Sequence, residues 1–114
     1  MGSPLTTHVL DIRLGKPAAG VAVCLEQRES SGEWLLVARK FTNDDGRVPD
    51  LLGEGELTLG VHRLRFDTGA YFAAQSVEHF YPQVAVEFEV TDVGRHHHVP
   101  LLLSPFGYST YRGV

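Results

Sequence analysis

The sequence predicts an all-β protein, a sandwich of two packed sheets, and three observations support this prediction. Short apolar stretches recur along all 114 residues and are separated by clusters of Gly, Pro, Asn and Asp, the residues that dominate turns. Several of these stretches alternate polar with apolar residues, which is the period of a strand with one buried face. Only one short stretch has the composition of a helix.

The first half of the chain is expected to form four strands, at residues 5–14, 21–26, 34–42 and 48–52. The first ends at residues 15–17, where a glycine and a proline interrupt the pattern. In the second, Val21, Val23 and Leu25 alternate with other residue types, so one face should be buried. The third ends at Asn43-Asp44-Asp45-Gly46, a strong turn cluster.

The second half is expected to contain strands at residues 58–67, 84–90, 95–104 and 108–113, with the single helix at residues 68–79. Three alanines and Gln75 favour the helix. Thr68 can cap its first turn, and Pro82 prevents its continuation. The strand at 84–90 alternates valine and phenylalanine with alanine and glutamate, so it should be half-buried.

Two strands carry aliphatic residues on both faces. In the first, Leu5, Thr7 and Val9 share one face, while His8, Leu10 and Ile12 share the other. In the seventh, Val99, Leu101 and Leu103 lie opposite His98, Pro100 and Leu102. A sheet that is apolar on both faces must bury its outer face elsewhere, most simply against another subunit. We therefore expect an oligomer whose sheet-to-sheet interface carries His8 and His98.

Length and charge limit the classes of partner. The chain is expected to form one domain, residues 1–114. Its 10 Lys and Arg against 14 Asp and Glu give a formal charge of −4, which argues against nucleic acid or an anionic membrane as the main partner. No apolar run of about 18 residues is present, so no membrane-spanning segment is expected.

The cellular compartment is expected to be the cytoplasm. The first residues lack the charged and apolar regions of a signal peptide, and the last three are not the Ser-Lys-Leu peroxisomal address. Cys24 is the only cysteine, so no internal disulfide can form and a reducing compartment suits the chain. It has no basic neighbour in sequence that would activate it, and a buried thiol is expected.

Seven motifs cover nearly the whole chain and together carry a resemblance to a known family. They are residues 5–11 (LTTHVLD), 15–18 (GKPA), 42–47 (TNDDGR), 67–72 (DTGAYF), 78–82 (EHFYP), 96–105 (HHHVPLLLSP) and 108–113 (YSTYRG). In content and order they resemble the 5-hydroxyisourate hydrolases, the transthyretin-like enzymes of purine breakdown. Each motif alone is weak, but the combination is highly specific.

The resemblance implies a fold, an assembly and a reaction. The fold would be prealbumin-like, with two four-stranded sheets and one short helix, assembled as a homotetramer that is a dimer of dimers. Active sites would lie in the channel where dimers meet. The substrate would be 5-hydroxyisourate, hydrolysed without metal or other cofactor to 2-oxo-4-hydroxy-4-carboxy-5-ureidoimidazoline in urate degradation.

The resemblance also assigns roles to individual residues. The catalytic histidines fall on His8 and His98, and the catalytic arginine falls on Arg47. The family's C-terminal tetrapeptide, which binds substrate, falls on Tyr111, Arg112, Gly113 and Val114, and we expect Ser109 to belong to the same substrate-binding pocket. Two residues depart from the family pattern, which usually has Tyr in place of His97 and Ser in place of Val114.

These residue types suit hydrolysis of an amide-like bond between nitrogen and a carbonyl carbon. Histidine, with an ordinary pKa of ~6.5, can activate water and protonate a leaving nitrogen. The permanent charge and forked donors of arginine can stabilise a carbonyl oxygen that becomes negative. We assign the proton transfers to His8 and His98 without deciding which is the base, and carbonyl binding to Arg47.

Two alternatives stay open. In the first, His96 and His98 share a strand face and His8 supplies a third imidazole, forming a zinc hydrolase site. In the second, the protein is a transthyretin-like carrier whose apolar channel is lined by residues such as Leu10 and Leu102. The remaining histidines, His62 and His79, match no catalytic motif and are expected to be structural or exposed.

Overall fold

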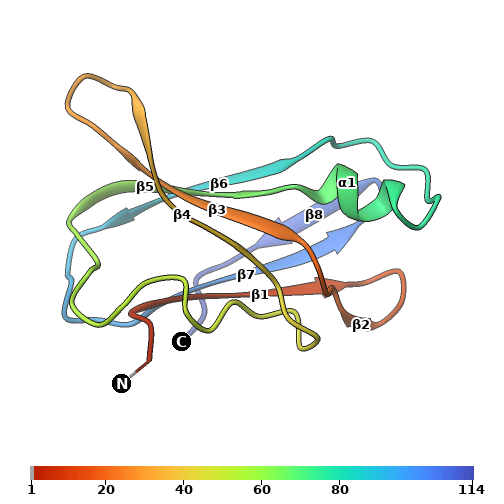
Figure 1. Ribbon diagram of the computed structural model, residues 1–114, viewed down its shortest axis with the longest axis horizontal. Helices are drawn as coiled ribbons and strands as arrows, with labels where there is room; N and C mark the ends of the chain where they lie inside the picture. Colours follow the sequence, from red (N-terminus) through yellow and green to blue (C-terminus); the bar gives the residue numbers. More distant parts are fainter. Residues whose placement is uncertain (1) are drawn as a thin grey trace.

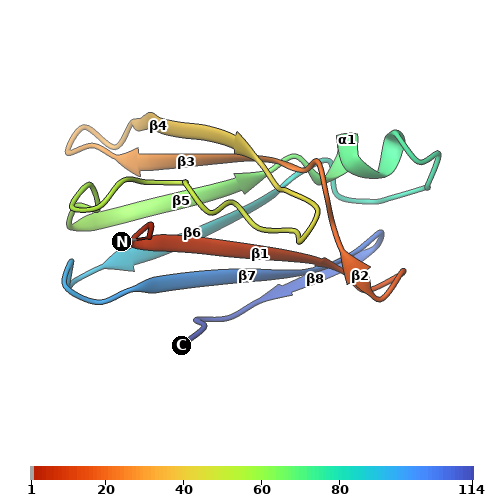
Figure 2. The ribbon, with the colours of Figure 1, turned by 60° about the horizontal axis from the view of Figure 1, so that its bottom comes forward.

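Two four-stranded sheets pack face to face in the computed structural model, which describes residues 2–114 (Figures 1 and 2). The first sheet has the order β2 (Lys16–Pro17), β1 (Leu5–Asp11), β7 (His97–Ser104) and β8 (Gly107–Thr110). The second has the order β4 (Trp34–Phe41), β3 (Ala22–Arg28), β5 (Gly60–Phe66) and β6 (Val84–Val90). The helix α1 (Thr68–Ala73) lies at one end of the sandwich. The predicted all-β sandwich with one short helix is confirmed.

One strand pair brings the two ends of the sequence together. β1 and β7 run parallel, with register partners from Leu5 and His97 to Asp11 and Leu103, whereas the neighbours in the second sheet are all antiparallel. Residues about ninety positions apart therefore lie side by side in the first sheet (Figure 2). This pairing positions the candidate site described below.

The core lies between the sheets and consists of the inward-facing aliphatic and aromatic side chains. Leu5, Val9 and Leu101 from the first sheet and Leu64 and Phe66 from the second are completely buried. Each such side chain contributes about 1.5–3 kcal/mol when it leaves water. Burial alternates residue by residue along β1, as the sequence pattern predicts for a strand with one face on the core.

Several elements differ from the expectation, including the last strand, which ends at Thr110 and not at residue 113. Residues 48–52 do not form a strand: they run as a loop that buries Val48, Leu51 and Leu52 on the core. β2 is a two-residue strand that the sequence pattern does not predict. β1 ends at Asp11 rather than at residue 14, because the chain turns there and the amides of Leu14 and Gly15 donate to the Asp11 carbonyl.

The helix is also shorter than the predicted range of 68–79, since it ends at Ala73. Ser76 adopts a positive φ of 56°, which a continuing helix does not allow. The amide of Val77 then donates to the Phe72 carbonyl, and the His79 ring stacks on the Phe72 ring. At the other end, the cap is Asp67 and not Thr68: its carboxylate accepts from the amide of Ala70.

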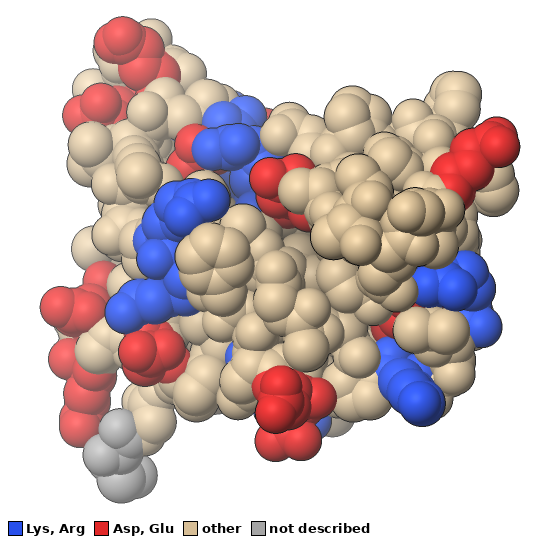
Figure 3. All heavy atoms as spheres, turned by 45° about the vertical axis from the view of Figure 1, so that its right-hand side comes forward, with Lys and Arg blue, Asp and Glu red and all other residues tan. Residues whose placement is uncertain are grey.

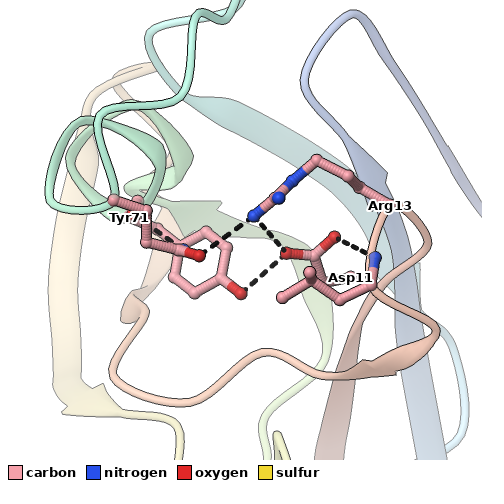
Figure 4. A network of polar contacts seen from close by, with 5 residues as sticks. Asp11, Arg13 and Tyr71 are labelled. Atoms are coloured by element: carbon pink, nitrogen blue, oxygen red, sulfur yellow. Dashed lines mark hydrogen bonds and ion pairs between the residues drawn. The ribbon is translucent and has the colours of Figure 1, made fainter.

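A buried carboxylate fastens the helix to the end of β1 (Figure 4). The Tyr71 hydroxyl donates to Oδ2 of Asp11 at 2.8 Å, and Arg13 lies 3.8 Å from the same oxygen. Arg13 also donates to Gln75 at 3.0 Å. Burial and the hydrogen bond to Asp11 raise the pKa of Tyr71, so the phenol remains a donor at neutral pH.

The outward faces of the two sheets differ in character. On the second sheet, Glu26 accepts hydrogen bonds from Arg63 at 2.7 Å and Arg65 at 3.3 Å, and Arg63 stacks over the Trp34 ring. On the first sheet, the outward positions of β1 and β7 include Leu10 and Leu102, which are half-buried in the single chain. The outward face of the second sheet thus carries a charged network beside exposed apolar residues of β4 such as Leu36 and Phe41, whereas that of the first sheet combines aliphatic residues with polar ones.

Charged groups elsewhere are mixed in sign. In Figure 3, Lys and Arg side chains are interspersed with Asp and Glu and with uncharged residues on the face shown. None of the helices in residues 2–114 is long and apolar enough to cross a membrane. Cys24 is buried, as expected from its place in a strand.

Candidate active site

His8 and His98 lie on the outward face of the first sheet. Each is half-buried and is flanked along its strand by residues that are buried in the core, such as Val9 beside His8 and Val99 beside His98. In the parallel register, Thr6 lies opposite His98 and His8 lies opposite Pro100. The two histidines are therefore diagonal neighbours on adjacent strands, a separation of about 7–8 Å or less in a sheet. This spacing suits two groups that act on one small ligand.

Arg47 is held beside His8 by the turn that precedes it. Asn43 Oδ1 accepts hydrogen bonds from the amides of Asp45 and Arg47, at 2.9 and 3.0 Å, and closes the turn. Arg47 then forms an isolated antiparallel bridge with His8. The turn that the sequence predicts at residues 43–46 thus places Arg47 beside His8.

Gly46 is required for this close approach. Its φ is +74°, in the left-handed region, and its carbonyl accepts from the amide of Val9 at 2.8 Å. A Cβ at this position would overlap the Val9 carbonyl oxygen. Only glycine combines that conformation with that contact, so the loop can reach β1 only with glycine before Arg47.

The environment lowers the pKa of both histidines. Burial and the nearby Arg47 charge lower the pKa of His8. Burial, Arg47, His96 and His8 all lower the pKa of His98. Both imidazoles are therefore mainly neutral near pH 7, with one ring nitrogen free to accept a proton. Since Arg47 affects both rings, the three groups share one electrostatic environment.

His98 has a defined hydrogen-bond partner that sequence reasoning missed. The Thr6 hydroxyl oxygen lies 2.8 Å from Nδ1 of His98 and also 2.8 Å from Nε2 of His96. Thr6 stands two residues before His8 and so shares its outward face. Its contact with His98 depends on the β1–β7 register, which no local feature of the sequence reveals.

The C-terminal residues reach the other side of His98. The Gly113 amide donates to the His98 carbonyl at 2.8 Å. A Cβ on Gly113 would overlap the His98 ring, so glycine is needed here for contact with the imidazole. Tyr111 and Arg112 line a cavity of about 240 Å³ together with His98. Val114 is fully exposed, and Ser109, on β8, is exposed opposite Leu102.

Within one chain the candidate residues open onto separate depressions. Arg47 lines a cleft of about 750 Å³ with Thr6 and His96, whereas His98 lines the smaller cavity beside β6. The structure thus brings His8, Arg47, His98 and the chain end to one region but does not enclose them in the single chain. A second surface is needed to exclude water there.

The other histidines serve the fold. The His62 ring is buried and stacks on Phe88, and its Nδ1 atom lies 3.0 Å from the Gly60 carbonyl oxygen. His97 is buried on the face opposite His98, with Nδ1 2.8 Å from the Arg95 carbonyl oxygen. A histidine in place of the family's usual tyrosine at position 97 therefore changes the interior and not the outward face.

The arrangement of the histidines bears on the zinc alternative. Within residues 2–114, no group of three or more His, Cys, Asp or Glu side chains has a geometry that could hold a metal ion. Nε2 of His96 and Nδ1 of His98 each lie 2.8 Å from the Thr6 hydroxyl oxygen. The outward face is therefore arranged for hydrogen bonding between imidazoles, which suits proton transfer.

Comparison with known proteins gives one consistent relationship. Residues 5–113 match the model of the HIUase/Transthyretin family. The 5-hydroxyisourate hydrolase of Halalkalibacterium halodurans is 48% identical over 118 residues, covering 99% of both chains. Sea bream transthyretin, solved in complex with thyroxine, superposes with a TM-score of 0.93 at 35% identity, over 98% of this chain and 96% of its own. Klebsiella pneumoniae 5-hydroxyisourate hydrolase superposes with a TM-score of 0.83 at 37% identity, over 96% of this chain and 92% of its own.

Proposed function

The chain belongs to the HIUase/transthyretin family, and from this premise we propose that it is a 5-hydroxyisourate hydrolase of urate catabolism. One observation carries the proposal: two imidazoles and a guanidinium share the outward face of the first sheet. Several relatives, from bacteria and from mouse, carry the name 5-hydroxyisourate hydrolase. Their sequence identities to this chain are similar to one another, and each match covers nearly the whole chain.

The reaction needs a nucleophile and a proton donor on either side of one carbonyl carbon. One neutral imidazole takes a proton from water, and the oxygen of that water forms a bond to the carbonyl carbon. The negative charge that develops on the carbonyl oxygen is stabilised by Arg47, which lies beside His8. The C–N bond then breaks, and the histidine that took the proton from water, now protonated, returns that proton to the leaving nitrogen.

The lowered pKa of both histidines supports this mechanism. Each imidazole is neutral at the start, so either can accept the first proton without prior deprotonation. Ordinary solvated histidines would be partly protonated near pH 6.5. The nearby Arg47 charge thus contributes before the reaction, by favouring neutral bases, and during it, by binding the developing anion.

The C-terminal residues are proposed to bind the substrate. Tyr111 and Arg112 share a cavity with His98, and Gly113 contacts its ring. Val114 lacks the hydroxyl that the family usually has at this position, although the terminal carboxylate remains. One neutral hydrogen bond contributes about 0.5–1.5 kcal/mol, so its loss reduces affinity or turnover and does not abolish them. Ser109 is assigned to the rim of the site.

We propose a homotetramer, a dimer of dimers, with active sites where first sheets of different dimers meet. The aliphatic outward face of the first sheet supports this assembly, because Leu10, Pro100 and Leu102 lie on the same face as the histidines. The open geometry of the site in one chain also supports it. The free thiol of Cys24 is compatible with the cytoplasm as the compartment.

A carrier function is the second candidate, because the thyroxine-bound sea bream protein has nearly the same fold. Fold alone does not decide function. A carrier of apolar ligands gains nothing from a charged guanidinium and two imidazoles that the ligand must desolvate. Arg47, His8 and His98 therefore favour the hydrolase.

The test is the absorbance decay of freshly prepared 5-hydroxyisourate with and without the protein. The hydrolase accelerates the decay in proportion to protein concentration, and this acceleration survives exhaustive dialysis against EDTA. An unchanged decay combined with tight thyroxine binding would establish the carrier. Activity that is lost with EDTA and restored by zinc would establish the metal alternative.

A further inference from the structure

In the described part of the chain, Thr6 is the only residue that hydrogen-bonds both the ring of His98 and the solvent-exposed ring of His96. Its hydroxyl oxygen lies 2.8 Å from Nδ1 of His98 and 2.8 Å from Nε2 of His96. His96 precedes β7 and is exposed on the cleft that Arg47 also lines. The three side chains thus form a continuous hydrogen-bonded path from the half-buried ring of His98 to solvent.

The chemistry of a hydroxyl makes the two imidazoles depend on each other. Threonine has one hydroxyl hydrogen, so Thr6 can donate to only one of the two ring nitrogens and must accept from the other. When Thr6 donates to His96, it accepts from Nδ1–H of His98, and Nε2 of His98 carries the lone pair of a base. When a protonated His96 donates to Thr6, the hydroxyl donates to Nδ1 of His98, and Nε2 then carries the hydrogen of an acid.

We infer that Thr6 and His96 are positioning and proton-relay residues for His98, an inference that rests on the proposed hydrolase function. Nε2 of His98 takes a proton from the attacking water while Nδ1–H of His98 passes its proton to the Thr6 oxygen. The Thr6 hydroxyl hydrogen moves at the same time to Nε2 of His96. His98 ends neutral with its hydrogen on Nε2, Thr6 ends neutral, and His96 becomes an imidazolium.

This relay leaves His98 ready for the second half of the reaction. Its Nε2–H now faces the leaving nitrogen, and reversal of the same path returns the proton from His96. No positive charge has to remain on the half-buried His98, where burial and the Arg47 charge both oppose it. The charge resides instead on His96, which is exposed to solvent.

Other charged groups surround this path and are part of its electrostatics. His8 on β1 and Arg47 act on His98, and the cavity beside His98 is lined by Tyr111 and Arg112 from the chain end and by Glu87 and Glu89 from β6. The cleft beside His96 is also lined by Asp45, Glu54 and Arg95. The carboxylates of Asp45 and Glu54 favour a positive charge on this side of the relay, and Arg47 and Arg95 oppose it.

The test compares Thr6→Val with Thr6→Ser. Valine has the shape of threonine without the hydroxyl, so it interrupts the path and keeps a β-branched residue in the strand. We expect Thr6→Val to lower kcat about 10- to 100-fold, part of the range for general acid–base catalysis, with KM nearly unchanged. Thr6→Ser restores the hydroxyl and should recover most of kcat.

His96→Ala removes the terminus of the relay and should lower kcat to a similar extent. Because both substitutions interrupt one path, the double variant should be no slower than the slower single variant. Because both single variants break the path between His98 and His96, they should change the pH profile of kcat in the same way. Additive losses, or a Thr6→Val variant with wild-type kcat and pH profile, would overturn the relay.

Nitrogen NMR of ¹⁵N-histidine protein tests the relay independently of the reaction. Protonation of His96 should move the hydrogen of His98 from Nδ1 to Nε2 in the wild type, and Thr6→Val should abolish this coupling. If the wild type fails to accelerate 5-hydroxyisourate decay, the proposed function fails, while the NMR titration still decides whether the two rings are coupled. If the wild type is active but the tautomer of His98 does not change when His96 is protonated, the relay is refuted and the proposed function is not.

Discussion

The ring of His98 is fixed by contacts with segments from both ends of the chain. The Thr6 hydroxyl on β1 is hydrogen-bonded to Nδ1 of the ring. Gly113, near the C-terminus, packs against the ring, and its amide donates to the His98 backbone carbonyl. Such contacts hold the imidazole in one orientation before any ligand arrives. Preorganisation of this kind lowers the entropy that must be lost when reacting groups are aligned.

Replacing His98 with alanine removes the imidazole that these contacts hold in place. His98→Ala should reduce turnover by about 10²–10⁴-fold, the usual contribution of a general acid or base. The assembly should be intact in size-exclusion chromatography, since the ring is not part of the core. His79→Ala, which removes a histidine that lies outside the candidate site and stacks on Phe72, is the matched control and should keep most of the activity. A loss below tenfold in His98→Ala would contradict its role.

The lowered pKa values predict the pH dependence of the reaction. A general base is active when unprotonated, so its activity falls as the pH drops through its pKa. Burial and the Arg47 charge lower the pKa of His8 and His98 below the ordinary 6.5. The acid limb of kcat/KM should therefore have its midpoint below pH 6.5, and Arg47→Gln should move that midpoint upward. A wild-type midpoint above 6.5 would show that the two imidazoles are not the bases.

The elements that could be predicted are those whose burial follows a local pattern. The strand predicted at residues 84–90 coincides with β6, because its alternation reflects one face packed on the core. The predicted range 48–52 is also rich in apolar residues but forms a loop, since Val48, Leu51 and Leu52 fill the core without strand partners. Apolar composition indicates burial, whereas strand formation also requires a neighbour to pair with.

The same distinction explains what could be predicted of the candidate site. Alternation along β1 and β7 places His8 and His98 on outward faces, and the structure has them there. Arg47 and the C-terminal residues were assigned only from motifs, because their approach depends on backbone contacts through Gly46 and Gly113. Thr6 was missed because its role depends on register between strands about ninety residues apart.

The attachment of α1 to β1 can be tested through Tyr71. Its hydroxyl donates to the Asp11 carboxylate, whose side chain is fully buried. Hydrogen bonds to charged groups contribute about 1.5–3 kcal/mol, so Tyr71→Phe should lower the free energy of unfolding by roughly that amount in urea denaturation. Tyr81→Phe, a half-exposed tyrosine that packs on Tyr108, is the control. Equal stabilities of the two variants would show that the Asp11 bond contributes little.

The two outward faces of the sandwich explain why assembly and activity belong together. On the outer face of the second sheet, the charged side chains of Glu26, Arg63 and Arg65 pair with one another within one chain. The outer face of the first sheet combines aliphatic residues with the candidate site, and such a face is stabilised by contact with a second apolar surface. A single contact between copies would then both bury the aliphatic residues and enclose the imidazoles.

Leu10→Asp tests this coupling. Leu10 is only half-buried in the single chain and lies on the same face of β1 as His8, so an aspartate leaves the core untouched but places a charge in the proposed interface. Burying an unpaired carboxylate costs several kcal/mol, enough to dissociate dimers from one another. We expect sedimentation velocity to show dimers, circular dichroism to show an intact sandwich, and hydrolysis to fall together with the tetramer fraction. Leu35→Asp introduces the same charge at an exposed leucine on β4 of the other sheet and should keep both assembly and activity. A fully active Leu10→Asp dimer would mean that one chain's own clefts enclose the substrate, and the site would then have to be placed within the protomer.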